Sequence, residues 1–254
     1  MNKDIKNWWN EYADYYQRNS KILTETAHYG PFSPDEKELN LLGNVKGKKI
    51  LELGCGGGQC SIAFARQGAF CTGIDFSEKQ LALANELTRK AKVGVNFIKG
   101  DIQDFKLKDG EKFDIVFSSF ALQFVPNLDK CFENVNKYLK KGGVFVFSLD
   151  HPFYAILSSD GRLESSYYKT GKYTEVTTAE VFGGKRKSDN KYKFTFYKRK
   201  VSDIFSSLIN TGFDVERIIE PNNFSKKDPW AKMYSLDVIS LIGPTIIFSA
   251  KKVK

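Results

Sequence analysis

From Lys48 onward, short apolar runs alternate with segments in which apolar residues recur at helical spacing. The apolar runs predict strands, because they are four to six residues long and are bounded by Gly, Asp, Ser or Lys. Strands that alternate with helices are typical of a parallel sheet covered by helices on both faces. The expected strands are Ile50–Leu53, Ala69–Ile74, Val95–Ile98, Phe113–Phe117 and Val144–Ser148.

The intervening segments complete a doubly wound α/β pattern. Ser77 is a residue type that caps helix N-termini, and Gly142 and Gly143 suit a C-terminal cap for the third expected helix. Two later strands, over 213–219 and 245–249, would close a Rossmann-like sheet of seven mostly parallel strands with an antiparallel last strand. The expected helices cover residues 61–67, 77–90, 128–139 and 202–210.

Two segments depart from this alternation. Residues 1–45 are rich in aromatic side chains and are broken by prolines, which predicts a partly helical lid segment. Residues 151–196 are rich in Tyr, Ser, Gly and Lys without a helical period, which predicts an insertion of loops and short strands that covers a substrate. The remaining domain is expected to span 46–254 and to contain this insertion after its fifth strand.

Composition narrows the functional classes only slightly. A chain of 254 residues with 41% hydrophobic residues can bury the core of one domain with a lid. The net charge of +9 leaves a nucleic-acid partner open, but the lysines are scattered, as on a solvated surface. A polar N-terminus and the lack of an apolar run near 20 residues predict a cytoplasmic protein without membrane contact. No metal site is expected, because no zinc-type spacing links Cys55, Cys60, Cys71 and Cys131.

A glycine-rich turn follows the first expected strand and precedes a helix. Glycines at this turn allow positive φ and let a ligand lie against the backbone. The dinucleotide fingerprint would require glycine at position 59, where this chain has Gln, so the spacing favours a nucleoside without a pyrophosphate. The candidate binding residues of this turn are Glu52, Gly54, Cys55, Gly56 and Gly58.

Carboxylates end or follow the next two expected strands. Asp75 can accept hydrogen bonds from both ribose hydroxyls, each contributing about 1.5–3 kcal/mol. Asp101 can accept from an adenine amino group while Ile102 packs on the ring. Phe76 and Ser77 are further candidates beside Asp75. Three strand ends with suitable groups predict one nucleoside site at the carboxyl edge of the sheet.

With these motifs in place, residues 45–150 resemble the class I S-adenosylmethionine-dependent methyltransferases. The resemblance is to the ubiquinone-biosynthesis type, the methyltransferase type 11 branch, and weaker matches outside this range indicate a separate subgroup. The segments that match are Val45–Gly58, Gly73–Ser77, Phe113–Gln123 and Leu139–Phe147.

The resemblance implies that S-adenosyl-L-methionine is the methyl donor and that 46–254 is the donor-binding methyltransferase domain. It implies that the turn glycines line the methionine portion, that Asp75 holds the ribose and that Asp101 meets the adenine. Ser118 and its neighbour Ser119 would lie near the sulfonium.

The same resemblance implies that the N-terminal segment folds over the cofactor, which makes Tyr16 and Tyr29 candidate lid residues. Aromatic faces near a sulfonium are favourable by up to about 2 kcal/mol. His28 and His151 are candidate general bases, and His151 follows the fifth strand at the ligand-binding edge. Either histidine can instead be structural, because transfer to an already deprotonated nucleophile needs no base.

The sequence therefore predicts a methyltransferase acting on an O, N or C nucleophile of a small-molecule acceptor. An RNA or protein methyltransferase that uses the Lys-rich insertion is the first alternative, and a non-catalytic nucleoside-binding protein of the same fold is the second. A nicotinamide-dependent dehydrogenase is disfavoured by the glycine spacing.

Overall fold

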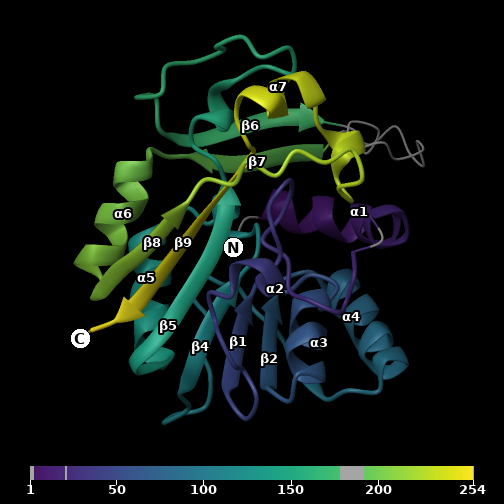
Figure 1. Cartoon of the computed structure of the whole chain (residues 1–254), viewed down its shortest axis with the longest axis vertical. Coiled ribbons are helices and arrows are strands. Elements are labelled where there is room, and N and C mark those ends of the chain that lie inside the picture. The colour runs from purple at the N-terminus through teal and green to yellow at the C-terminus, as the bar shows by residue number, and fades with distance from the viewer. Residues whose placement is uncertain (1–2, 21, 178–191, 254) are drawn as a thin grey trace.

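A computed structural model describes residues 3–20, 22–177 and 192–253 (Figure 1). The expected fold is confirmed: seven strands form one sheet in the order β3-β2-β1-β4-β5-β9-β8. The first five are parallel, and β9 runs antiparallel to both β5 and β8. The strands are β1 (Lys49–Leu53), β2 (Phe70–Asp75), β3 (Val95–Lys99), β4 (Phe113–Ser118), β5 (Leu139–Asp150), β8 (Phe213–Ile219) and β9 (Thr245–Lys252).

Apolar clusters cover both faces of this sheet. On one face Phe64 of α3 packs edge-on against Phe117 of β4. On the other face Phe132 of α5 packs against Phe145 and Phe147 of β5, and α6 continues the layer. The helices of these layers are α3 (Gln59–Arg66), α4 (Glu78–Ala91), α5 (Leu128–Tyr138) and α6 (Val201–Asn210).

The expected glycine cap after α5 is wrong. The helix ends at Tyr138 and β5 begins at the next residue, so both glycines lie inside the strand. Gly142 has φ 72°, and a Cβ on Gly143 would lie 2.9 Å from the carbonyl oxygen of Asp114. The glycines therefore accommodate the shifted register at the start of the β4–β5 pair.

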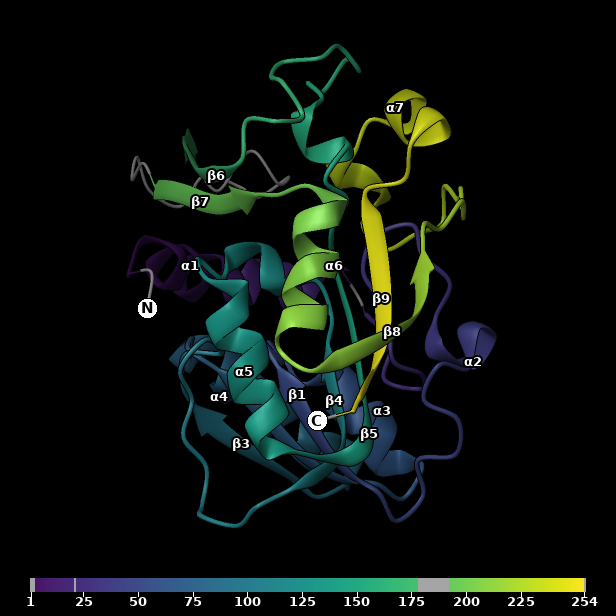
Figure 2. The same cartoon turned by 90° about the vertical axis from the view of Figure 1, so that its left-hand side faces the viewer.

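A second layer lies above the carboxyl ends of the parallel strands. The long helix α1 (Lys3–Ser20) lies between that edge of the sheet and a two-stranded antiparallel hairpin of β6 and β7, as both views show (Figures 1 and 2). Trp8 of α1 packs against Phe194 of β7, with ring centroids 4.9 Å apart. The remaining elements are α2 (Glu36–Leu39), η1 (Leu122–Phe124), η2 (Tyr154–Ile156), β6 (Gly171–Thr177), β7 (Tyr192–Lys198), η4 (Ala231–Met233) and α7 (Leu236–Leu241).

The hairpin of β6 and β7 agrees with the expected insertion of short strands after β5. The three basic residues at 185–187 of this Lys-rich insertion lie outside the described residues. Within the described residues, no helix is both long enough and apolar enough to span a membrane.

Candidate active site

A cavity of about 400 Å³ lies between the strand ends and the second layer. Its floor comes from residues that end or follow the five parallel strands β1 to β5, and its roof comes from α1, the hairpin and the loop before α7. Open α/β sheets bind ligands at this edge. The predicted residues that line it are Glu52, Gly54, Cys55, Gly56, Asp75, Phe76, Asp101, Ile102, Tyr16 and His28.

The glycine turn forms a close-fitting floor. Gly54 has φ 69° and Gly56 has φ 50°, and residues other than glycine rarely adopt this region of backbone conformation. A Cβ on Gly54 would overlap the Cβ of Ala121, which follows β4. The turn therefore brings bare backbone to the cavity, as the methionine portion of the donor would require.

Asp75 lies at the end of β2 and is 8% exposed. Its Oδ2 accepts from the Gly56 backbone N–H at 3.0 Å, and its Oδ1 accepts from the Ser77 N–H at 2.8 Å. Burial raises the pKa of this carboxyl to about 6, although both hydrogen bonds favour its ionised form. These two bonds hold a hydrogen-bond acceptor rigidly at the cavity wall. Such an acceptor fits a pair of ribose hydroxyls.

Groups suited to adenine come from the loop after β3, which carries Asp101, and from η1 after β4, which carries Gln123. The Gln103 N–H donates to Oδ1 of Asp101 at 3.0 Å and orients this carboxylate. Gln123 is 3% exposed and donates to the Phe120 carbonyl at 2.9 Å, yet its Oε1 has no hydrogen-bond partner among the described residues. A buried acceptor without a partner is costly, and an adenine amino group would satisfy it. The sequence reasoning gave Gln123 no role, because its burial cannot be read from the motif.

Glu52 supports the glycine turn from below. Its Oε2 accepts from the Ser61 N–H at 2.8 Å and also from the Ser61 hydroxyl, which fixes the start of α3. Burial raises the pKa of Glu52 to about 7. Burial also raises the pKa of the Cys55 thiol well above its usual range, so this thiol is neutral in the cavity wall.

Two candidates near the glycine turn are not among the residues that line the cavity. A Cβ on Gly58 would lie 2.7 Å from the ring of Phe97, so this glycine allows α3 to pack closely. The Ser77 hydroxyl accepts from the Gln80 N–H at 3.1 Å and caps α4. Their expected contact with the donor is replaced by a structural role one layer below.

Ser118 and Tyr29 also lie outside the cavity lining. Ser118 is fully buried and its hydroxyl donates to the Leu53 carbonyl at 2.9 Å, so its neighbour Ser119 is the residue that faces the cavity. Strand alternation explains the exchange, because successive side chains point to opposite sides. Tyr29 is fully buried in the core and donates to Glu36, so the prediction that it is a lid residue is wrong.

The two histidines have different surroundings. His28 lines the cavity, with its Nδ1 3.0 Å from the Ser119 hydroxyl and its ring 5.1 Å from that of Trp230. Burial lowers the pKa of His28 to about 4, so this ring is neutral at pH 7.

His151 does not line the cavity. Its Nε2 is 2.9 Å from Oε1 of Glu220, and its Nδ1 accepts from the Phe153 N–H at 3.1 Å. The expectation that placed a base at His151 thus fails on orientation, and the preceding residue, Asp150, lines the cavity instead.

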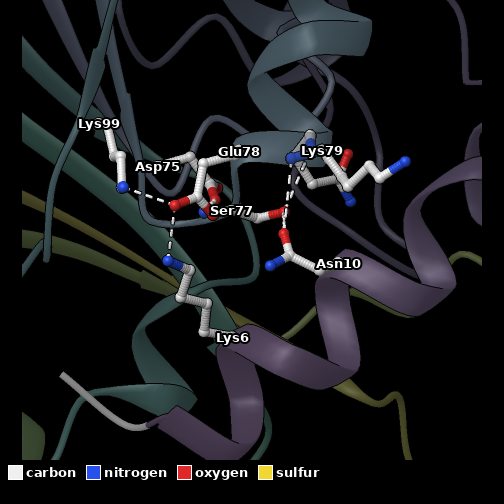
Figure 3. A network of polar contacts seen from close by, with 8 residues as sticks. Lys6, Asn10, Asp75, Ser77, Glu78, Lys79 and Lys99 are labelled. Atoms are coloured by element: carbon white, nitrogen blue, oxygen red, sulfur yellow. Dashed lines mark hydrogen bonds and ion pairs between the residues drawn. The ribbon is translucent and has the colours of Figure 1, made fainter.

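Helix α1 is anchored on the N-terminus of α4 (Figure 3). Lys6 and Lys99 both pair with Glu78, at 2.7 and 2.5 Å. Asn10 Oδ1 accepts from the Ser77 hydroxyl at 2.7 Å. The cap of α4 and helix α1 are therefore joined directly beside Asp75.

The far end of α1 closes over the glycine turn. Gln17 donates to Gln80 Oε1 at 2.9 Å and accepts from Gln59. Tyr16 accepts at its hydroxyl from Nε1 of Trp230 at 2.9 Å, which joins the helix to the loop before α7. The sequence gave no sign of this contact, since 214 residues separate the two side chains.

These features suit a nucleoside ligand in a covered cavity, and comparison with known proteins identifies the family of the chain. Residues 44–196 match the methyltransferase domain family, and the chain belongs to this family. The expected S-adenosylmethionine-dependent methyltransferase of class I is confirmed, with S-adenosylmethionine as its cofactor.

The chain is similar over its full length to an uncharacterized protein of Haemophilus influenzae, at 28% identity over 96% of this chain and 99% of that one. It is 36% identical to the ubiquinone biosynthesis O-methyltransferase of Coxiella burnetii over 41% of this chain and 44% of that enzyme, so this match spans less than half of either protein. Among solved structures, an S-adenosylmethionine-dependent methyltransferase from Mesorhizobium loti matches with a TM-score of 0.65, at 25% identity over 84% of this chain and 95% of that one.

Proposed function

We propose that the enzyme transfers a methyl group from S-adenosylmethionine to an O, N or C nucleophile of a small-molecule acceptor enclosed in the cavity. The observation that carries this proposal is the roof, in which α1, the hairpin and Trp230 cover the strand ends. A covered cavity of about 400 Å³ has the size of a small-molecule site. The name of the Coxiella relative, an O-methyltransferase of ubiquinone biosynthesis, supports the same acceptor class.

In this proposal the donor lies along the glycine turn. The Asp75 carboxylate accepts from the ribose hydroxyls, and Asp101 with Gln123 accepts from the adenine amino group. The sulfonium then lies beyond Gly54, toward Ser119 and His28. The chain's order of strand ends supports this direction, because adenine, ribose and methionine follow β3, β2 and β1 in the sheet.

S-adenosylmethionine supplies an electrophilic methyl group on a positive sulfonium. The protein's contribution is to hold the acceptor in line with the carbon–sulfur bond and to exclude water, and positioning alone can supply a large part of the rate. The aromatic roof, which includes Trp9, Tyr12 and Tyr16, offers ring faces to a cation.

The first expected result concerns the acceptor class. Cell extract incubated with methyl-labelled S-adenosylmethionine and this enzyme should carry the label in small molecules, unchanged by ribonuclease. Incorporation should fall little between about 50 and 200 mM salt, whereas an RNA held through several phosphates loses orders of magnitude in affinity over that range. Label that ribonuclease removes, with a steep salt dependence, would favour the RNA alternative, and label in proteins would favour the protein one.

A further inference from the structure

The end of β5 carries a carboxylate that the donor does not need. Asp150 is the last residue of β5, is in register with Thr245 of β9, and lines the cavity. Two strands, β1 and β4, separate β5 from β2, which ends in Asp75. Neighbouring strands lie about 4.8 Å apart, so β2 and β5 are about 14 Å apart across the sheet. Asp150 therefore lies at the opposite end of the cavity from the proposed ribose site.

Within the described residues, Asp150 has no hydrogen-bond or ion-pair partner. Every other acidic side chain on the floor is oriented by a donor: Glu52 by Ser61, Asp75 by Gly56 and Ser77, and Asp101 by Gln103. Asp150 is half-buried, and carboxylates removed from water are normally paired or hydrogen-bonded. An unpartnered carboxylate facing a ligand cavity indicates that its partner is the ligand.

The titratable groups that share this end of the cavity do not neutralise Asp150. Burial raises the pKa of Tyr154 to about 12 and raises that of Tyr234 well above its usual value, and Asp150 contributes to both shifts, so both tyrosines are neutral. His28 is neutral at pH 7 because burial lowers its pKa to about 4. Burial raises the pKa of Asp150 itself to about 7, which suits a group that exchanges a proton near neutral pH.

The charged side chains of the cavity lining indicate which charge the acceptor can carry. Lys198 is the one lysine or arginine among the described residues of the lining, and it lies on the hairpin, 4.3 Å from the ring centroid of Tyr173. The carboxylates of the lining are Glu52, Asp75, Asp101, Asp150, Glu164 and Glu175. An acidic cavity in a chain of net charge +9 disfavours an anionic acceptor.

Resting on the proposed function, we propose that Asp150 binds the acceptor through an O–H or N–H group and takes its proton, and that the acceptor carries no net negative charge. The acceptor oxygen or nitrogen forms a bond to the methyl carbon while the carbon–sulfur bond breaks and its electron pair stays on sulfur. The released proton moves to the Asp150 carboxylate and then to water when the product leaves.

The melting temperature of Asp150→Asn tests this role. Replacing a carboxylate that is paired in the folded protein should lower the melting temperature, whereas replacing Asp150 should raise it. Because its pKa is raised in the folded protein, ionised Asp150 destabilises the fold increasingly as pH rises from about 4 to 7. The variant should therefore melt several degrees above the wild type at pH 8, and the gap should be much smaller at pH 5. Asp114→Asn is the matched control, since Asp114 accepts from the Lys49 N–H and pairs with Lys140, and it should lower the melting temperature at pH 8.

Turnover and acceptor charge complete the test. With label from S-adenosylmethionine and cell extract, Asp150→Asn should lower incorporation by about 10²–10⁴-fold while S-adenosylhomocysteine affinity stays within about twofold. The acceptor should pass through an anion exchanger, and retention on a cation exchanger would distinguish an amine from a hydroxyl. Full turnover by the variant, a melting temperature lowered at pH 8, or an acceptor found only in the anionic fraction would overturn the assignment. If the wild-type enzyme transferred no label to small molecules, that result would instead contradict the proposed function.

Discussion

Replacing Gly54 with alanine is expected to weaken S-adenosylhomocysteine binding at least 100-fold, about 2.7 kcal/mol. The new Cβ would overlap the Cβ of Ala121 and approach Ile102, so the glycine turn must move away from β4. That movement displaces the Gly56 N–H, which orients Asp75. Calorimetric titration of the purified variant measures the loss.

Gly43→Ala separates backbone strain from the overlap in the cavity floor. Gly43 has φ 61°, close to the 69° of Gly54, but a Cβ there would meet nothing within 4 Å. Left-handed backbone costs a residue with a side chain about 1–2 kcal/mol, so both variants should lose several degrees of thermal stability. Only Gly54→Ala should lose affinity for S-adenosylhomocysteine. Equal affinities of the two variants would contradict the role of the glycine turn as a close-fitting floor of the cavity.

Asp75→Ala should weaken S-adenosylhomocysteine binding at least tenfold, because two charge-assisted hydrogen bonds to the ribose are lost. Asp114→Ala is the matched control, since it removes a carboxylate at the opposite end of the sheet, near the start of β4 and outside the cavity. Its affinity for S-adenosylhomocysteine should remain that of the wild type. Titration calorimetry that finds Asp75→Ala unchanged would remove Asp75 from the donor site.

The pKa of Asp75 predicts that the affinity for S-adenosylhomocysteine depends on pH. With a pKa of about 6, Asp75 is ionised above that pH, and as the pH falls through it the carboxyl loses the charge that strengthens its hydrogen bonds as an acceptor. If the ionised form binds the ribose, affinity should fall about tenfold between pH 7 and pH 5 in the wild type. Asp75→Asn should show a shallower fall, and the difference between the two curves isolates this carboxyl from Glu52 and Asp150.

The sequence predicted the sheet, and it brought together residues that line the cavity, because both depend on local patterns. Five apolar runs marked the parallel strands, and the carboxyl ends of parallel strands share one edge, so Gly54, Asp75 and Asp101 had to lie together. Alternation along a strand was the limit of this reasoning. Sequence alone could not say which of Ser118 and Ser119 faces the cavity, and it favoured His151 where Asp150 lines the cavity, since a shift of one residue reverses the direction of a side chain.

The acceptor side could not be predicted because long-range contacts build it. Trp230 reaches Tyr16 across 214 positions, and Phe194 covers Trp8 from a hairpin whose pairing no local motif specifies. Gln123 became a candidate only when its buried Oε1 was found without a partner among the described residues. The chemistry of such a site depends on which side chains the fold leaves unsatisfied.

A crystal structure with S-adenosylhomocysteine tests the central claim most directly. The account predicts both ribose hydroxyl oxygens within about 3.2 Å of the Asp75 carboxylate, and the adenine amino group at Asp101 or Gln123. It also predicts that the sulfur atom faces the β4 and β5 ends, where Asp150 lies, with α1 closed over it. Adenosine bound at the Asp150 end, or a sulfur atom directed away from the covered cavity, would contradict the account.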